Sequence, residues 1–191
     1  MKEMMKMMLV LSLICGFAGI SLAALKEITS PVIEEQVLTF VQAPAIEYVL
    51  KSHDNDPIKD RKKYSLNTRV VTVFPGIKNG ILESIAFETS GKGYGGNIGV
   101  MVGFDISTQT LSGIGITTLK ETPGLGSRVA EHGYTTQFRG HPIQSIALKK
   151  NGGDIDAVAG ATISSTGTVA AVQDAISLFM QLKTELADGW S

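Results

Sequence analysis

A threonine hydroxyl just ahead of a predicted helix is the feature of this sequence best placed to carry chemistry. Residues 156–165 read Asp-Ala-Val-Ala-Gly-Ala-Thr-Ile-Ser-Ser and lead directly into an amphipathic C-terminal segment. A helix N-terminus presents unpaired amides and a partial positive charge, which together favour a phosphate group. A phosphate joined to Thr162 would meet those amides. The same residues also fit an ordinary loop before a helix capped by Ser164 or Ser165.

Two glycine-containing segments can bring backbone close to a flat ligand. Segment 120–128 follows a predicted strand and contains a Pro-Gly turn, although on its residues alone it is simply a loop. Segment 91–96 matches the G-x-G-x-x-G pattern of dinucleotide-binding sites. That pattern requires a following helix, whereas residues 97–102 are typical of a strand. We therefore interpret 91–96 as a glycine-rich turn between strands.

Other kinds of site find little support. His53, His132 and His141 have no metal-ligand spacing, and no metal site is expected. The one cysteine, Cys15, rules out an intrachain disulfide, and the bulky Ile14 before it argues against a lipoprotein signal. The formal net charge of -1, with no basic stripe, indicates no nucleic-acid partner.

The elements that must position these segments are mostly extended. Strands that follow one another with little helix between them predict antiparallel pairing and an α+β fold with flanking helices. Residues 107–110 are expected to close a hairpin, and Pro75-Gly76 to mark a turn. We expect helices over 25–50, as a stalk, and over 165–186, with a polar linker at 52–64. The predicted strands are 68–74, 81–89, 98–106, 111–119 and 143–149.

The N-terminus predicts a membrane anchor. Residues 7–25 are uncharged and mostly apolar, and a helix of this length spans about 30 Å, the thickness of a bilayer's hydrocarbon core. A cleaved signal peptide is the rival interpretation, but its apolar region is normally shorter. Lys2 and Lys6 favour a cytoplasmic N-terminus, with the body of the protein on the outer face. The expected organisation is 1–6 cytoplasmic, 7–25 transmembrane helix, 26–64 stalk and linker, and 65–191 as the domain.

Taken together, these segments resemble the FMN-binding domain family. The likeness is to the RnfG (RsxG) subunit of Rnf electron-transport complexes and to the NqrC subunit of sodium-translocating NADH:quinone reductases. It rests on the N-terminal span and on three motifs in order: GYGGNIGVMVGFD, TTLKETPGLGSR and DAVAGATISS. The compact length is more similar to RnfG.

The resemblance implies particular roles for these residues. The acceptor motif of the family is roughly D-x-x-[ST]-G-A-T, and its last Thr carries FMN through a phosphoester installed by an ApbE-type flavin transferase. That Thr corresponds to Thr162, and Ala159 stands where the family usually has Ser or Thr. The 120–128 loop is implied to lie against the isoalloxazine ring. The implied cofactor-binding residues are Thr162, Asp156, Gly160, Ala161, Ser164, Glu121, Thr122, Gly124, Leu125, Gly126 and Tyr94.

The function implied by the resemblance is that of a membrane-anchored electron-transfer subunit of an ion-translocating ferredoxin:NAD oxidoreductase. Its expected partners are the other Rnf membrane subunits, the flavin transferase and the lipid bilayer, and it has no substrate turnover of its own. Two alternatives stay open. One is a flavin-free extracytoplasmic binding or scaffold module, which the departure at Ala159 favours. The other is an NqrC-like subunit.

Overall fold

The computed structural model describes residues 2–66 and 69–189. It divides the chain into two units, Met1–Val41 and Gln42–Ser191. The second unit begins well before residue 65, where the sequence suggests the domain starts. The reason is that the last helical turns of the expected stalk contribute buried side chains, Ile46 and Val49, to this unit.

The first unit is helical from Lys2 onward. Helix α1 runs from Lys2 to Val37 and continues into a π-helical turn, η1, at Leu38–Gln42. Pro31 lies inside this continuous helix. By length and composition, the helical stretch Lys2–Val49 is apolar enough to cross a membrane, with a mean hydropathy of 2.4 in its most apolar window. The expected helices over 7–25 and 25–50 are thus confirmed as helical.

The second unit is built on an antiparallel sheet whose strands lie in chain order, which confirms the α+β prediction. Strands β4 and β5 form the expected hairpin, and the glycine-rich segment 91–96 ends β3 and turns the chain into β4. The strands are β1 (Lys62–Leu66), β2 (Arg69–Lys78), β3 (Ile81–Lys92), β4 (Asn97–Asp105) and β5 (Thr110–Thr118).

Two predictions near the start of the sheet are wrong. Pro75-Gly76 is not a turn: β2 runs through it with Pro75 opposite Ile85, and the chain only bulges after Gly76. The turn is Asn79-Gly80, whose φ angles of 51° and 77° suit a two-residue hairpin loop. The supposed linker 52–64 also contains the start of β1, a charged edge strand, and charge is typical of edges that must not pair further.

The strand expected at 143–149 is also absent from the described residues. This segment makes one isolated bridge, Leu148 to Ile155, and Pro142 just before it makes another to Thr110. Its apolar residues have another role, since Ile143, Ile146 and Leu148 are buried in the core. The chain then turns through the short helix η4, Lys149–Asn151.

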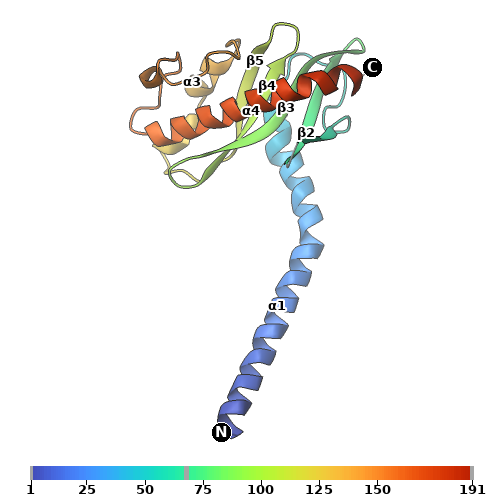
Figure 1. Ribbon diagram of the computed structural model, residues 1–191, viewed down its shortest axis with the longest axis vertical. Coiled ribbons are helices and arrows are strands. Elements are labelled where there is room, and N and C mark those ends of the chain that lie inside the picture. The colour runs from blue at the N-terminus through green and yellow to red at the C-terminus, as the bar shows by residue number, and fades with distance from the viewer. Residues whose placement is uncertain (1, 67–68, 190–191) are drawn as a thin grey trace. The chain divides into compact units, whose positions relative to one another are not determined.

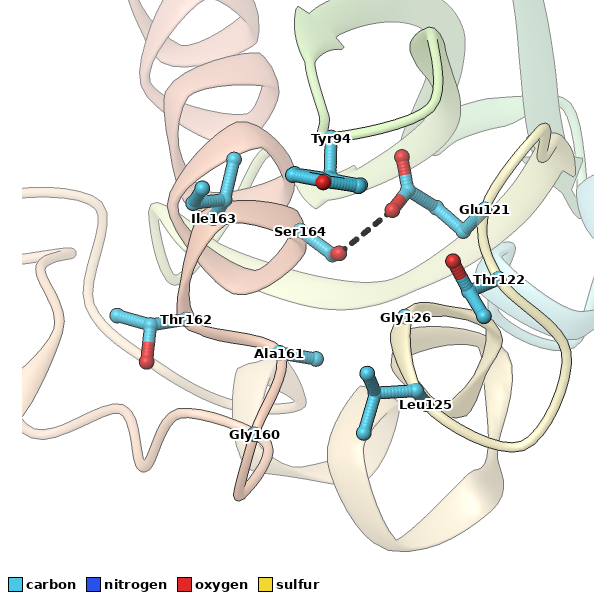
Figure 2. A pocket seen from close by; sticks show the side chains of 10 residues that line it. All are labelled: Tyr94, Glu121, Thr122, Leu125, Gly126, Gly160, Ala161, Thr162, Ile163 and Ser164. Carbon is cyan, nitrogen blue, oxygen red and sulfur yellow. Dashed lines mark hydrogen bonds between the residues drawn. The ribbon is translucent and has the colours of Figure 1, made fainter.

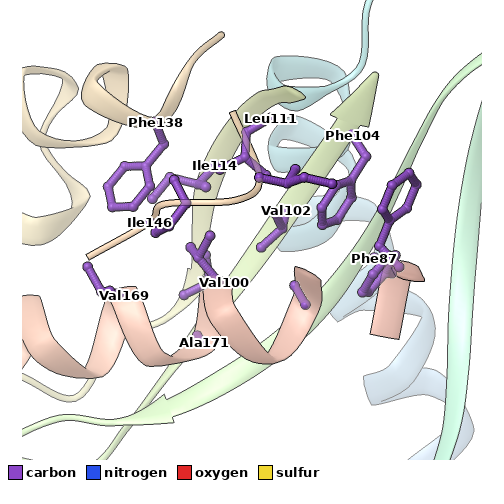
Figure 3. Packing of buried hydrophobic residues seen from close by; sticks show 14 of the residues in the cluster. Phe87, Val100, Val102, Phe104, Leu111, Ile114, Phe138, Ile146, Val169 and Ala171 are labelled. Carbon is purple, nitrogen blue, oxygen red and sulfur yellow. The ribbon is translucent and has the colours of Figure 1, made fainter. Parts of the chain in front are cut away.

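Helices cover both faces of the sheet. Helix α4, Thr162–Gly189, lies across one face (Figure 1). There Phe104 stacks between Phe87 and Phe179, with ring centroids 5.3 and 4.5 Å away. Figure 3 shows Phe87 and Phe104 in this core. It crosses β3 at the contact between Gly91 and Gly167. The approach there is so close that a Cβ on Gly167 would lie 2.5 Å from the Lys92 carbonyl oxygen. The contact is backbone against backbone.

Helix α2, Ala43–Val49, packs against β4 and β5 on the opposite face. There a Cβ at Gly103 would lie 2.5 Å from the Val49 carbonyl oxygen. Just beyond α2, Lys51 pairs with Asp105, which is 2% exposed and also accepts hydrogen bonds from residues of the β4–β5 turn. Burial would raise the pKa of Asp105, but the hydrogen bonds from Lys51 and the turn outweigh it and hold that pKa far below the ordinary value.

Short helices fill the remaining side of the core. They are η2 (Gly126–Ala130), α3 (His132–Thr135) and η3 (Thr136–Phe138). Val129 and Phe138 are fully buried, so the core fixes the segment near both ends. This segment connects directly to the loop that the sequence singles out at 120–128.

Candidate functional site

Thr162 is the first residue of α4, and its side chain is exposed. The helix starts three residues earlier than expected, because the Ala161 carbonyl already accepts the Ser165 N–H at 3.0 Å. Ser164 and Ser165 are therefore not caps but members of the first turn. Early N–H groups of a helix have no acceptor within it, so this turn presents donors beside the Thr162 hydroxyl.

The loop ahead of Thr162 is shaped by Ser165. The Ser165 hydroxyl accepts the Val158 N–H at 2.9 Å and donates to the Ala161 carbonyl at 3.0 Å. The Ala161 N–H closes a turn onto the Val158 carbonyl at 2.9 Å. Gly160 sits inside this turn with a φ of 78°, a left-handed conformation that glycine adopts without steric cost.

Glu121 joins three separate segments of the chain. Its Oε2 accepts a hydrogen bond from the Ser164 hydroxyl at 2.7 Å, and its Oε1 accepts the Gly95 N–H at 3.0 Å. The first contact reaches α4 and the second reaches the turn between β3 and β4. Hydrogen bonds to a charged acceptor are stronger than neutral ones, so Glu121 holds the start of α4 and the glycine-rich turn against its own loop.

Gly126 leaves room for that carboxylate. A Cβ at Gly126 would lie 2.5 Å from Glu121 Oε2 and 2.7 Å from Ser164 Oγ. Any larger residue would push apart the pair whose hydrogen bond closes this wall. The glycine is therefore required by space and not by backbone conformation.

These segments enclose an open cavity of about 490 Å³. Figure 2 shows the Glu121–Ser164 bond on one side of it and Thr162, at the start of α4, on another. Three exposed apolar side chains also line it: Tyr94 is 74% exposed, Ile163 53% and Leu125 45%. The lining residues are Tyr94, Glu121, Thr122, Leu125, Gly126, Gly160, Ala161, Thr162, Ile163 and Ser164.

Nearly all the candidate residues are thus brought to one cavity, from three distant parts of the chain. The two exceptions are Asp156, whose carboxylate pairs with Lys149 Nζ at 2.7 Å, and Gly124, which donates its N–H to Ser127 Oγ at 2.9 Å. Ala159 is exposed and does not line the cavity either. The sequence reasoning missed Ile163, although its place directly after Thr162 was a usable signal.

Tyr134 supports the site from behind. Its hydroxyl donates to the Ser165 carbonyl at 3.2 Å and joins α3 to the first turn of α4. Burial raises the pKa of Tyr134 to about 12, so the group stays a neutral donor at physiological pH. Within the part of the chain that the structure describes, no group of His, Cys, Asp and Glu side chains is arranged to hold a metal ion.

Comparisons with known proteins agree with this geometry. A family model described as FMN-binding domain matches residues 93–177, which include every residue that lines the cavity. The match therefore begins at the glycine-rich turn and extends through most of α4.

The RnfG subunit of ion-translocating oxidoreductase complexes is similar over most of the chain. The protein from Methanosarcina acetivorans is 30% identical over 137 residues, which cover 71% of this chain and 73% of that one. The protein from Stutzerimonas stutzeri is 31% identical over 177 residues, covering 87% and 76%. Among solved structures, the NqrC subunit of the Na⁺-translocating NADH-quinone reductase from Parabacteroides distasonis has a TM-score of 0.54 at 22% identity, covering 68% of each chain. This last likeness shows a shared fold.

Proposed function

The chain belongs to the RnfG family of ion-translocating oxidoreductase complexes, and we propose that it is a membrane-anchored, FMN-carrying electron-transfer subunit of an Rnf-type complex. The observation that carries the proposal is one cavity that is lined by Thr162, by the first turn of α4 and by the 121–126 loop. An NqrC-like role has less support, since the curated relatives are RnfG proteins.

The residues of the cavity fit FMN by size and by chemistry. A volume of about 490 Å³ falls in the range of ordinary cofactor sites. Tyr94, Leu125 and Ile163 offer apolar surface to a flat ring, while the α4 N-terminus offers donors to a phosphate. When bound, a flavin accepts and releases electrons. The chain itself supplies placement and electrostatics.

We further propose that Thr162 holds the cofactor through a phosphoester installed by an ApbE-type transferase. Its hydroxyl is exposed at the beginning of α4, where a modifying enzyme can reach it. Ala159, the departure from the usual motif, lies outside the cavity lining, so the hydroxyl it lacks is not one that faces the cofactor.

Residues 7–25, which lie within the helical stretch Lys2–Val49, are the proposed membrane anchor. Lys2 and Lys6 at its leading end favour the cytoplasmic side, which leaves the second unit on the outer face. A covalent bond there would prevent loss of the cofactor from the cell. The expected partners of the protein are the remaining membrane subunits of the complex, which supply and remove electrons.

Replacing Thr162 tests the attachment. The full chain is co-expressed with a flavin transferase, and the covalent adduct is read by intact mass and by fluorescence after denaturing electrophoresis. Thr162→Val should abolish the adduct and Thr162→Ser should retain it. Thr166→Val is the matched control, because this exposed threonine lies one turn further along α4 and its hydroxyl donates to the Thr162 carbonyl at 2.7 Å.

Four results would contradict the proposal. An adduct that persists in Thr162→Val would move the attachment elsewhere. An adduct lost equally in Thr166→Val would mean that the helix, not the hydroxyl, was disturbed. A wild-type chain that stays colourless beside an active transferase would favour a flavin-free binding module. Purification of the chain with Nqr-type membrane subunits would assign it to the other complex.

A further inference from the structure

The side chain of Gln137 forms two hydrogen bonds with the backbone of Asp156. Its side-chain Oε1 accepts the Asp156 N–H at 2.7 Å, and its Nε2 donates to the Asp156 carbonyl at 3.3 Å. A primary amide that bonds both backbone groups of one residue imitates a neighbouring strand, and it satisfies a segment that lies outside the sheet. Gln137 does not line the cavity.

These two hydrogen bonds lie where the segment leading to Thr162 begins. Between Val158 and Ala161 the chain is shaped by its own turn and by Ser165, so these contacts move together with α4. Asp156 lies ahead of that turn, and its carboxylate pairs with the exposed Lys149. The Ile155 N–H and carbonyl, one residue ahead, bond the backbone of Ala147 and Lys149, and Gln137 is the contact that ties Asp156 itself to the segment containing η3.

That other part is the segment forming the opposite cavity wall. Gln137 belongs to η3, which follows α3 directly. Glu131 alone separates α3 from η2, and η2 begins at the cavity residue Gly126. Phe138, the next residue, is fully buried and fixes η3 in the core. The Tyr134 hydroxyl bonds the same segment to α4. The segment 126–138 thus contacts both the cavity wall at Gly126 and the residues 156–162 that lead to Thr162.

We propose that Gln137 is a positioning residue for the modification of Thr162. It fixes segment 156–162 relative to the cavity wall, so that the hydroxyl is presented in one orientation. The inference rests on the proposed function. In the step concerned, Thr162 Oγ1 forms a bond to phosphorus while the phosphoanhydride of a flavin dinucleotide donor breaks. A nucleoside monophosphate leaves, and it takes up the proton that the hydroxyl loses.

Three variants of the full chain test this role. Gln137→Met keeps the length of the side chain and loses both bonds, while Gln137→Glu keeps the acceptor for the Asp156 N–H and loses the donor. Gln173→Met is the matched control, because Gln173 also bonds a backbone carbonyl, that of Ile146 at 2.7 Å, but far from segment 156–162. The initial rate of adduct formation is followed by intact mass, and amide hydrogen exchange of segment 156–162 is measured without transferase.

The expected initial rate falls about tenfold or more in Gln137→Met, because small misplacements of a reacting group are costly. It should fall less in Gln137→Glu and remain unchanged in Gln173→Met, with faster exchange of 156–162 only in the Gln137 variants. A wild-type rate in Gln137→Met would overturn the proposal, as would equal slowing in Gln173→Met. If the wild type itself formed no adduct, the proposed function would fall, and the exchange measurement would still decide whether Gln137 holds the segment.

Discussion

Two buried serines allow a sharp test of how the loop before Thr162 is held. Ser165 is fully buried, accepts the Val158 N–H and donates to the Ala161 carbonyl. Ser84 is 1% exposed, and within the described residues its hydroxyl has no hydrogen-bond partner. Replacing each with alanine removes one oxygen from a buried position, so the two changes have the same size and differ in hydrogen bonding.

The magnitude follows from which groups lose a partner. In Ser165→Ala the Ala161 carbonyl keeps the Ser165 N–H at 3.0 Å, so only the buried Val158 N–H is left without an acceptor. An unpaired buried donor costs about 1–3 kcal/mol. In Ser84→Ala no partner is stranded, and the free energy of unfolding should stay the same or rise by up to about 1 kcal/mol.

The assay is urea unfolding of the full chain in detergent, followed by circular dichroism in the aromatic region. Ser165→Ala should lower the midpoint and Ser84→Ala should not. Amide exchange at Val158 should accelerate in the first variant alone. Equal midpoints for the two variants would refute the reasoning, because they would mean that the Ser165 hydroxyl contributes nothing that an unpartnered hydroxyl lacks.

Two further predictions concern the cavity and the opposite face of the sheet. Gly126→Ala should lower the free energy of unfolding by about 1–3 kcal/mol through overpacking against Glu121 and Ser164, and should reduce adduct yield, as urea melts and intact mass will show. Asp105→Asn should cost about 2 kcal/mol at neutral pH, since Lys51 loses a charged acceptor. Because folding lowers the pKa of Asp105 below its ordinary 3.8, its contribution is complete above that pH and is lost in acid, so the urea midpoints of wild type and variant should converge as pH falls.

Much of the fold could be predicted from local pattern. The segments over 81–89, 98–106 and 111–119 show β-branched or alternating residues, and each is a strand. The cavity could also be anticipated, because its residues come from short continuous motifs. The motifs themselves do not contain the joining contacts. That Glu121 bonds Ser164 and Gly95 depends on how α4 crosses the sheet.

The misses have physical causes. Asn79-Gly80 is a clear local turn signal, but Pro75-Gly76 is a competing one. The chain passes through Pro75-Gly76 as part of β2, with a β-bulge after Gly76 and no turn. The apolar residues over 143–149 are buried in the core without strand pairing. Gln137 has no local signal at all, since an amide that brackets a backbone nineteen residues away, at Asp156, is defined only by tertiary structure.

The backbone contact between Gly91 and Gly167 makes α4 a lever with unequal arms. Its short arm, from Gly167 to Thr162, is about 7.5 Å long, and its long arm, to the end of the helix, about 33 Å. A tilt of about 5° about this fulcrum would displace the far end by about 3 Å and Thr162 by about 0.7 Å. A displacement of the C-terminal end of α4, caused by a docking protein or by substitutions there, therefore moves Thr162 by a much smaller distance.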